Sequence, residues 1–295
     1  MSRFRFVRAQ APHYPVRRLC QVLGVGVASY YRWQKKAGSR LLVPAWEQAL
    51  CQTFSQHKRR YGTRRLRAEL RAQGHRIGRH RIRQALRRRE LVALQPRAFV
   101  PRTTCSEQGP RVAANHVLAR PAPMAPDQIW VGDITYLPLQ NGNWAYLAAF
   151  QDVYTKRVVG WQVLGTMPEA LVTTALRRAL VSRQPAAGLV VHSDRGGQYC
   201  GKAYRRLLTD RHLVRSMSRR GECYDNAQAE SLWSRVKTEV LLGRSAFASV
   251  AEAQVELAMY FDYYNHQRRH SALGYECPHS FEQQLLLTNA QLCLT

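Results

Sequence analysis

Acidic residues are scarce in the first 120 residues of this sequence, where 4 Asp and Glu stand against 27 Lys and Arg. The rest of the chain is nearly balanced, with 15 acids against 18 bases, so most of the formal net charge of +26 lies in the amino-terminal part. A strongly basic surface attracts polyanions, and nucleic acid is the commonest of them. The charge distribution therefore predicts a nucleic-acid-binding region followed by a nearly neutral one.

Long apolar runs are also missing. No stretch reaches the roughly 20 apolar residues that a membrane-spanning helix needs. The first residues, Met-Ser-Arg-Phe-Arg-Phe-Val-Arg, lack the apolar segment of a secretory signal. Nor does the chain hold a basic amphipathic helix with a clean hydrophobic face, which a membrane-surface protein would carry. We expect no membrane partner and a cytoplasmic, nucleoid-associated protein.

Cysteine spacing typical of a zinc site is absent. The seven cysteines are scattered and odd in number, and no Cys-x-x-Cys or Cys/His cluster occurs. Reduced and mostly buried thiols are the expectation. The cysteines are Cys20, Cys51, Cys105, Cys200, Cys223, Cys277 and Cys293.

The basic region contains two helix-turn-helix patterns. Residues 16–35 predict two short helices around a turn at 24–26, within an amino-terminal helix-turn-helix-like segment, 1–40. Alone this signal is weak, because a plain helical hairpin has the same pattern. The second pattern lies in an arginine-rich domain, 44–95, where Thr63 can cap one helix, Gly74 ends it and a second helix covers 79–89.

Arginines crowd the outer faces of this second pair of helices. So many like charges repel one another unless phosphates neutralise them, although a solvated basic face is the simpler alternative. We therefore predict a DNA-binding domain, without assigning which arginines read bases and which hold phosphates. The candidate contacts are Arg64, Arg65, Arg79, Arg81 and Arg83.

Prolines interrupt residues 96–126, which we interpret as a linker.

Strand-like segments then cover 129–139, 144–152 and 157–164, with a hairpin turn at 141–143. A helix over 168–183, a strand over 188–194, a helix of about ten residues, a strand over 214–218 and a helix from about residue 226 follow. This order predicts an α/β domain with a mixed sheet over 127–245. Residues 246–295 add a helix over 250–264 and a basic aromatic tail.

Three carboxylates of this second region can converge. Asp133 lies in the first strand, Asp194 ends a later strand, and Glu230 begins an amphipathic helix that Asp225 or Asn226 can cap. Clustered acids repel unless cations neutralise them, and oxygen ligands suit Mg²⁺ or Mn²⁺. Two such ions about 4 Å apart support phosphodiester chemistry. The simpler alternative makes each acid a turn, cap or sheet residue.

Two other polar features near these acids are not expected to be catalytic. Asp152 also ends a strand, but it is followed by a turn at 154–157 that it can cap, so we predict a structural role. His192, Ser193 and Asp194 are consecutive in a strand, where adjacent side chains point to opposite faces. A serine-hydrolase relay among them is therefore excluded.

Five segments in order resemble the integrase-type core of bacterial insertion-sequence transposases, and specifically the second-frame product of elements whose catalytic domain is similar to retroviral integrase. The arginine-rich block 61–91 resembles the helix-turn-helix module of the same group, so the resemblance covers nearly the whole chain. The five segments are Trp130-Val-Gly-Asp-Ile-Thr-Tyr136, 152–161, His192-Ser-Asp-Arg-Gly-Gly-Gln-Tyr199, Tyr224-Asp-Asn-Ala-Gln-Ala-Glu-Ser-Leu-Trp233 and 264–275.

The resemblance implies a ribonuclease-H-like fold and a DDE triad of Asp133, Asp194 and Glu230, which would hold two Mg²⁺ ions that Mn²⁺ can replace. It also implies that Lys237, two helical turns after Glu230, contacts DNA near the scissile phosphate. Arg195 and Asn226, which lie inside the matching segments, are further candidate DNA contacts.

Departures from the family are few. Cys277 stands before Pro278 where a small hydroxyl residue is expected, and no His/His/Cys/Cys zinc module precedes the core. Family members also commonly act as a longer frameshift fusion, and no sustained leucine heptad appears in this chain. An upstream-frame partner or fused segment is therefore a further expectation.

These features predict a metal-dependent DNA transposase that cleaves element ends and joins them to target DNA. The expected partners are the terminal inverted repeats, the target DNA and at least one further copy of the chain. One rival is a ribonuclease-H-like nuclease, which would not join a 3′-OH to a target. The other is a non-catalytic DNA-binding regulator, which needs only the arginine-rich helices.

Overall fold

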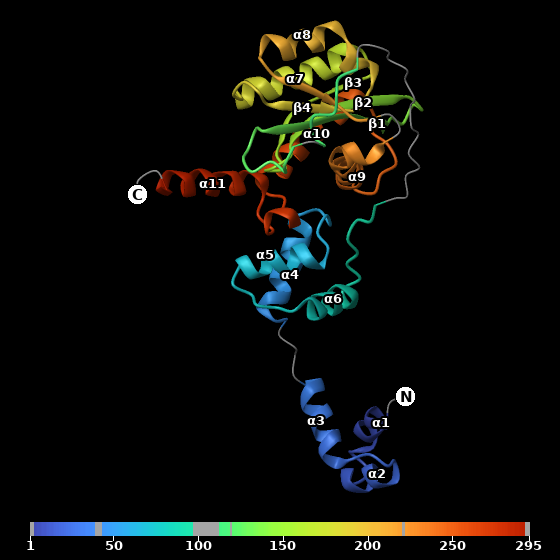
Figure 1. Cartoon of the computed structure of the whole chain (residues 1–295). Coiled ribbons are helices and arrows are strands. Elements are labelled where there is room, and N and C mark those ends of the chain that lie inside the picture. Colours follow the sequence, from blue (N-terminus) through green and yellow to red (C-terminus); the bar gives the residue numbers. More distant parts are fainter. Residues whose placement is uncertain (1–2, 39–42, 97–111, 119, 220–221, 293–295) are drawn as a thin grey trace. The chain divides into compact units, whose positions relative to one another are not determined.

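A computed structural model describes residues 3–38, 43–96, 112–118, 120–219 and 222–292 (Figure 1). The chain divides into two compact units, Met1–Ala49 and Leu50–Thr295.

The first unit is helical. It contains α1 (Arg3–Gln10), α2 (Val16–Val22) and α3 (Val27–Gly38), and Val7, Cys20 and Tyr30 form its buried centre. Gly24 adopts a positive φ of 61° between α2 and α3, where a side chain would be strained. The two helices and the turn predicted over 16–35 are confirmed, and α1 packs with them.

The arginine-rich helices follow α4 (Ala45–Gln56). They are α5 (Thr63–Ala72) and α6 (Arg79–Arg88), whose apolar faces bury Leu66, Leu70 and Ile82. Gly74, with a φ of 87°, terminates α5 as predicted. The cap prediction was wrong: α5 starts at Thr63 itself, and the capping position is Gly62, which has no side chain to offer.

A five-stranded sheet organises the rest of the chain. Its strands are β1 (Ile129–Pro138), β2 (Trp144–Asp152), β3 (Val158–Leu164), β4 (Val190–Ser193) and β5 (Val214–Met217), in the order β3-β2-β1-β4-β5. The first three are antiparallel, whereas β4 is parallel to both β1 and β5. The predicted mixed sheet is therefore confirmed, with β1 at its centre.

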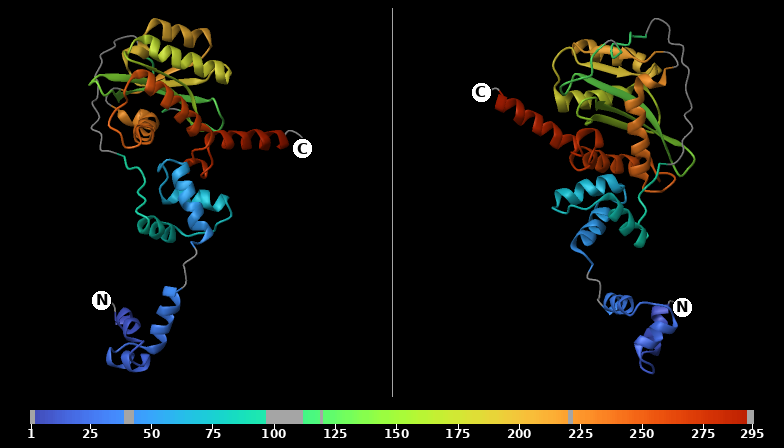
Figure 2. Two further views of the ribbon diagram at one scale, coloured as in Figure 1. Left: turned by 180° about the vertical axis from the view of Figure 1, so that it is seen from behind. Right: turned by 60° about the horizontal axis from the view of Figure 1, so that its bottom comes forward.

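Helices cover both faces of this sheet (Figures 1 and 2). Helices α7 (Glu169–Arg183) and α8 (Lys202–Asp210) pack on one face, and α9 (Ala227–Leu241) and α10 (Val250–His266) pack on the other. The backbone of α7 approaches β3 so closely that a Cβ at Gly160 would lie 2.4 Å from the carbonyl oxygen of Ala175. The sheet thus separates two apolar cores in a ribonuclease-H-like, three-layer arrangement.

Part of the predicted linker belongs to this fold. Residues 97–111 and 119 lie outside the described residues, but 112–118 runs beside the edge strand β5. The amide nitrogens of Ala113 and His116 donate to Met217 Sδ at 3.4 Å and to Ser216 Oγ at 2.9 Å. The amide of Met217 in turn donates to the carbonyl of Ala114 at 3.3 Å. Residues 112–118 therefore cover a sheet edge that would otherwise present unpaired groups.

The carboxy-terminal residues are more ordered than a polar tail. After α10 the chain forms the short helix η4 (Ser271–Leu273) and then α11 (Pro278–Leu292). Glu282 of α11 is buried between Arg157 and Arg183, and its Oε2 lies 2.6 Å from Arg157 Nη1. Over the described part of the chain, every helix is too short or too polar to span a bilayer.

Candidate active site

The central strand β1 presents Asp133 toward α9. Asp133 Oδ2 accepts a hydrogen bond from Trp233 Nε1 at 2.8 Å, and Oδ1 accepts one from the amide of Ile134 at 2.8 Å. Trp233 lies one turn after Glu230 on α9. The hydrogen bond therefore holds this side of α9 against the strand that carries Asp133.

Asp194 comes directly after β4, next to β1. The parallel register pairs Val131 with His192, so Asp133 and Asp194 lie two residues further along neighbouring strands. This is the carboxyl end of the sheet, where open α/β folds place their sites. Asp194 Oδ1 also accepts from the amide of Gly196 at 2.9 Å, which is the local turn that we considered as an alternative role.

Glu230 lies in the first turn of α9, and its side chain is exposed. The helix packs on β1 because Leu232, Trp233 and Val236 are buried on the side that faces the sheet. Each such aliphatic side chain contributes roughly 1.5–3 kcal/mol when fully buried. The apolar face thus sets the rotation of α9 and leaves Glu230 at the rim of the site.

Electrostatics link these groups. Burial, then the charge of Asp194, and more weakly that of Glu230 raise the pKa of Asp133 to about 7, against the opposing hydrogen bonds from Trp233 and Ile134. Burial also raises the pKa of Asp194. The effect of Asp194 and Glu230 on Asp133 means that the three acids share one electrostatic environment.

Lys237 belongs to the same environment. It lies two turns after Glu230 on α9, and its side chain is partly buried. Burial lowers the pKa of Lys237, while the carboxylate of Asp133 raises it. Lys237, Asp194 and Glu230 therefore lie around Asp133, in the middle of β1.

The donor set suits a hard divalent cation, because all three acids offer carboxylate oxygens. Among the residues that the structure describes, no three His, Cys, Asp or Glu side chains are grouped closely enough to hold a metal ion. Asp133 and Asp194 are fixed by hydrogen bonds, whereas Glu230 is exposed at the rim. Asp133, Asp194 and Glu230 therefore do not form a closed ligand group in this structure.

The start of α9 differs from the capping prediction. Asn226 occupies the capping position, yet its side chain makes no capping hydrogen bond and is buried. Its Oδ1 atom has no hydrogen-bond partner among the described residues. Asp225 instead pairs with Arg219, whose Nη2 lies 3.1 Å from Oδ1, and accepts from Asn115 Nδ2 at 2.9 Å. Asp225 therefore pairs with residues outside α9 and does not cap the helix.

The other acid near the sheet is structural, as predicted. Asp152 is fully buried and accepts hydrogen bonds from the amide and hydroxyl of Thr155, at 2.6 and 2.8 Å. His192 directs its ring nitrogens to Ser216 and Ser218, at 2.9 and 3.2 Å, and not to Ser193. The exclusion of a hydrolase relay is confirmed.

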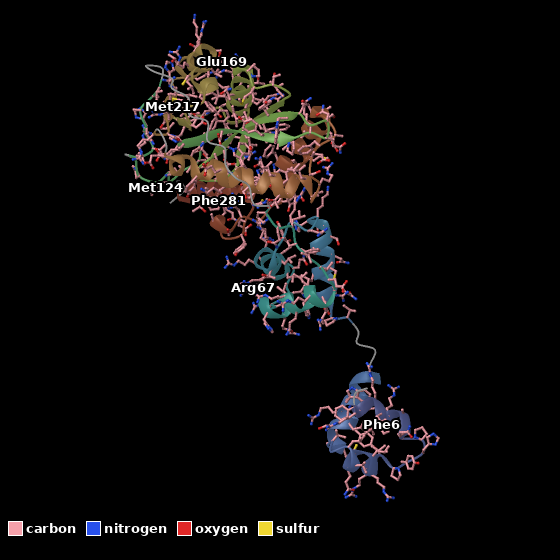
Figure 3. All side chains as sticks on the ribbon, turned by 90° about the vertical axis from the view of Figure 1, so that its right-hand side faces the viewer. Phe6, Arg67, Met124, Glu169, Met217 and Phe281 are labelled. Carbon is pink, nitrogen blue, oxygen red and sulfur yellow. The ribbon has the colours of Figure 1, made fainter. Side chains whose placement is uncertain are left out.

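The arginines predicted to contact DNA fall into two groups. Arg195 and Arg65 both make protein contacts: Arg195 Nε donates to the carbonyl of Ser218 at 2.8 Å, and Arg65 Nη1 lies 3.4 Å from Glu239 Oε1. The other four, Arg64, Arg79, Arg81 and Arg83, are exposed on α5 and α6, and Figure 3 labels Arg67 on the same surface. Further exposed arginines on these helices and beside them are Arg67, Arg71, Arg76, Arg87, Arg88 and Arg89.

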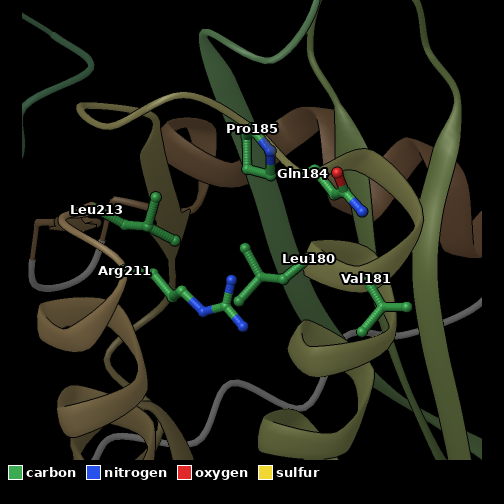
Figure 4. A pocket seen from close by; sticks show the side chains of 6 residues that line it. All are labelled: Leu180, Val181, Gln184, Pro185, Arg211 and Leu213. Carbon is green, nitrogen blue, oxygen red and sulfur yellow. The ribbon is translucent and has the colours of Figure 1, made fainter.

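The hollow drawn in Figure 4 contains none of these groups. It has a volume of about 400 Å³ and lies between the end of α7 and the start of β5. Its only ionisable lining residue is Arg211, and no carboxylate faces it. This hollow is therefore separate from the candidate active site around β1.

Sequence reasoning missed two side chains of the site. Trp233 was interpreted only as part of the apolar face of its helix, although its indole nitrogen also binds Asp133. Tyr199, in η2 (Gly197–Cys200), is buried near Asp133 and Asp194, whose charges together with burial raise its pKa. A polar atom on a buried aromatic residue close to a candidate acid is the signal that could have identified both.

Family models match most of the chain. An "integrase core domain" model matches residues 123–223, a second model of the same description matches 213–278, and an "HTH-like domain" model matches 47–99.

Two curated relatives are similar over their full length. One is the insertion element IS600 uncharacterized 31 kDa protein of Shigella sonnei, 39% identical over 278 residues, which cover 90% of this chain and 98% of that protein. Another is the transposase InsF for insertion sequence IS3A of Escherichia coli, 33% identical over 293 residues, which cover 96% and 99%. A solved structure, the HTLV-2 integrase catalytic core domain in complex with magnesium, aligns with a TM-score of 0.43 at 12% identity, over 54% of this chain and 98% of that one.

Proposed function

The chain belongs to the insertion-sequence transposases with an integrase core domain, which are DDE-type polynucleotidyl transferases, and we propose that it cleaves DNA at the ends of its element and joins them to a target. One observation carries this proposal. The parallel register of β1 and β4 brings Asp133 and Asp194 to the same end of the sheet, where burial and the second acid raise the pKa of Asp133 to about 7. Such crowding of acids is costly unless a cation neutralises it.

We assign Asp133, Asp194 and Glu230 as the catalytic acids that hold divalent metal. Mg²⁺ is the natural candidate because all ligands are oxygens, and Mn²⁺ should replace it. Two bound ions would activate the attacking oxygen and stabilise the leaving oxygen of a phosphodiester. Trp233 holds Asp133 in place for this role through its indole nitrogen, 2.8 Å from Oδ2.

The proposed reaction has two steps. In the first, a water oxygen attacks the phosphodiester at an element end, and the departing oxygen becomes a free 3′-OH. In the second, that 3′-OH attacks a target phosphodiester, so that one P–O bond forms as another breaks. No covalent protein intermediate is needed. The acids would hold the metal that orients the reacting phosphate, while Lys237 binds the DNA backbone beside it.

The DNA partner follows from the exposed arginines of α5 and α6. We propose that Arg64, Arg79, Arg81 and Arg83 contact the terminal inverted repeats, mostly through phosphates. The helix-turn-helix-like segment 1–40 and the domain 44–95 would then hold the element end, while the core 127–245 performs the chemistry.

Two element ends must meet for transposition, which argues for at least a dimer on DNA. An upstream-frame segment, fused or separate, would add to this assembly. We place the protein at the nucleoid, where its substrate lies.

Cleavage and joining on a duplex that ends in the inverted repeat flanking the gene test the proposal. We expect Asp194→Asn to lower both steps about a thousandfold, which corresponds to roughly 4 kcal/mol of transition-state stabilisation, without weakening DNA binding. Asp210→Asn is the matched control, because Asp210 is exposed on α8 and pairs with Arg206 one turn earlier. Normal joining by the Asp194 variant would refute the metal-site assignment. Cleavage without any joining would favour the nuclease alternative.

A further inference from the structure

The segment between α10 and α11 contacts both the arginine-rich helices and α9. Gln267 accepts a hydrogen bond from Tyr61 Oη at 3.2 Å through its carbonyl, and the amide of Arg269 donates back to Tyr61 Oη at 2.8 Å. The guanidinium of Arg269 also pairs with Glu69 of α5. Residues 264–275 formed one of the sequence motifs, and the proposed chemistry gives this motif no task.

Glu239 of α9 lies at the centre of the same contact. It is buried, and Arg268 binds it with two hydrogen bonds of 2.6 and 2.7 Å. Tyr260 Oη donates to it at 3.1 Å, and Arg65 Nη1 of α5 lies 3.4 Å away. Arg60, just before α5, donates to the backbone carbonyl of Glu239 at 2.9 Å.

Aromatic rings reinforce this contact of α5 and the residues before it with α9, α10 and the segment after α10. We call this contact the joint. The guanidinium of Arg60 lies over the rings of Tyr260 and Tyr263, 5.3 and 4.5 Å from their centroids. His57 Nδ1 lies 3.0 Å from Tyr263 Oη, and the His57 ring stacks on Tyr61 at 3.9 Å between centroids. Cation–π and stacking contacts of this kind are strongest where water is excluded.

Helix α5 therefore has two differently charged faces. Its exposed stripe carries Arg64, Arg67 and Arg71, at the three- and four-residue spacing of one helical side. Its opposite side carries Arg65 and Glu69, which pair with Glu239 and Arg269. One rigid element thus joins the proposed DNA-binding surface to the helix that carries Glu230 and Lys237.

We propose that Arg65 and Glu239 are positioning residues that transmit DNA binding on α5 to helix α9. This inference rests on the proposed function, because it takes the exposed arginines as the DNA contact and Glu230 as a catalytic acid. DNA held by the outer face of α5 orients the joint, the joint fixes the carboxy-terminal half of α9, and the helix brings Glu230 to the two aspartates.

Hydrogen exchange of the α9 amides in the full chain tests the coupling, with and without a saturating duplex that carries the inverted repeat. In wild-type protein, DNA should slow exchange over residues 234–241. In Arg65→Gln, most of this slowing should disappear, while the Kd for the duplex rises less than about threefold, because Arg65 does not face the DNA. Arg64→Gln is the matched control: it should weaken DNA binding but keep the full slowing at saturation.

Lys237 on α9 is itself proposed to bind DNA, so Arg65→Gln is compared with its parent in a Lys237→Gln background. There, slowing that persists in Arg65→Gln would mean direct contact between DNA and another part of α9. That result, or the absence of slowing in wild-type protein, would overturn the coupling. Arg65→Lys keeps the charge and should keep part of the slowing, which covers the case in which the Gln variant does not fold. Joining activity of wild-type protein is scored separately, so a failure of the proposed function is distinguishable from a failure of the joint.

Discussion

Helix α9 carries one glutamate near its start and another near its end, and the two have opposite surroundings. Glu239 is buried, and although burial alone would raise its pKa, Arg268 and then Arg65 hold that pKa below its usual value. Glu230 is exposed beside two aspartates whose pKa values are raised. Removing the partner of a buried paired acid destabilises the fold, whereas crowded acids with raised pKa values are candidates for a functional site.

The largest expected effect is a loss of activity, and it should distinguish the exposed Glu230 from the buried Glu239. Glu230→Gln should lower strand cleavage about a thousandfold, since about 4 kcal/mol of transition-state stabilisation would be lost. Its melting temperature should stay within about 1 °C of wild type, because the side chain is exposed. A cleavage assay and a thermal melt of the same preparation check both statements. Unchanged cleavage would remove Glu230 from the site.

The second effect concerns stability alone. Arg268→Gln should lower the free energy of unfolding by about 3–5 kcal/mol, because Glu239 would keep a buried charge with weaker partners. Arg206→Gln, in an exposed pair with Asp210, should change it by less than about 0.5 kcal/mol. Chemical denaturation measures both values. Equal losses of the free energy of unfolding from the two substitutions would mean that the buried Arg268–Glu239 pair matters no more to stability than the exposed Arg206–Asp210 pair.

The third effect depends on pH. The raised pKa of Asp133, about 7, means that the folded state binds its proton more tightly than the unfolded chain, so ionising Asp133 costs stability as pH rises from about 4 to 7. In chelator at pH 8, Asp133→Asn should therefore melt several degrees, on the order of 5 °C, above wild type.

At about pH 4 both proteins carry a neutral side chain at position 133, so their melting temperatures should converge. Saturating Mg²⁺ at pH 8 should stabilise wild type alone and narrow the gap. A difference that stays constant across the pH range would contradict the ionisation of Asp133 as its cause.

The smallest effect lies on the arginine-rich surface. Arg83→Gln should weaken binding of any duplex severalfold and reduce the slope of log K against log salt by about 1, because one phosphate contact is lost. Arg178→Gln, on α7, is the control with the same charge change, and its guanidinium lies over Trp161. Fluorescence titrations at several salt concentrations give both slopes. Equal slopes for Arg83→Gln and Arg178→Gln would mean that DNA does not bind at Arg83.

Sequence reasoning reached the strands and the acids they carry because their signals are local. Asp133 and Asp194 lie in apolar segments with clear ends, so the sheet and its carboxyl edge could be predicted before their pairing was known. The buried face of α9 followed equally from the spacing of Leu232, Trp233 and Val236. These features depend on neighbours within a few residues.

The joint around Glu239 could not be predicted, because its partners lie far away in sequence. Arg65 is 174 residues from Glu239, and Arg268 is 29 residues away. Local capping rules failed at Asp225 because its carboxylate pairs with Arg219, six residues earlier, and with Asn115, 110 residues earlier. Helix α11 was missed because its leucines form a run and not a helical stripe.

The most direct test of the central claim is a calorimetric titration of Mg²⁺ into DNA-free protein at pH 8. Wild-type protein should bind the ion, and Asp133→Asn and Asp194→Asn should each weaken that binding at least tenfold, since each removes a charged oxygen ligand. Asp210→Asn should leave the affinity unchanged. Equal Mg²⁺ affinity in wild type and in both active-site variants would contradict the assignment of these acids as a metal site.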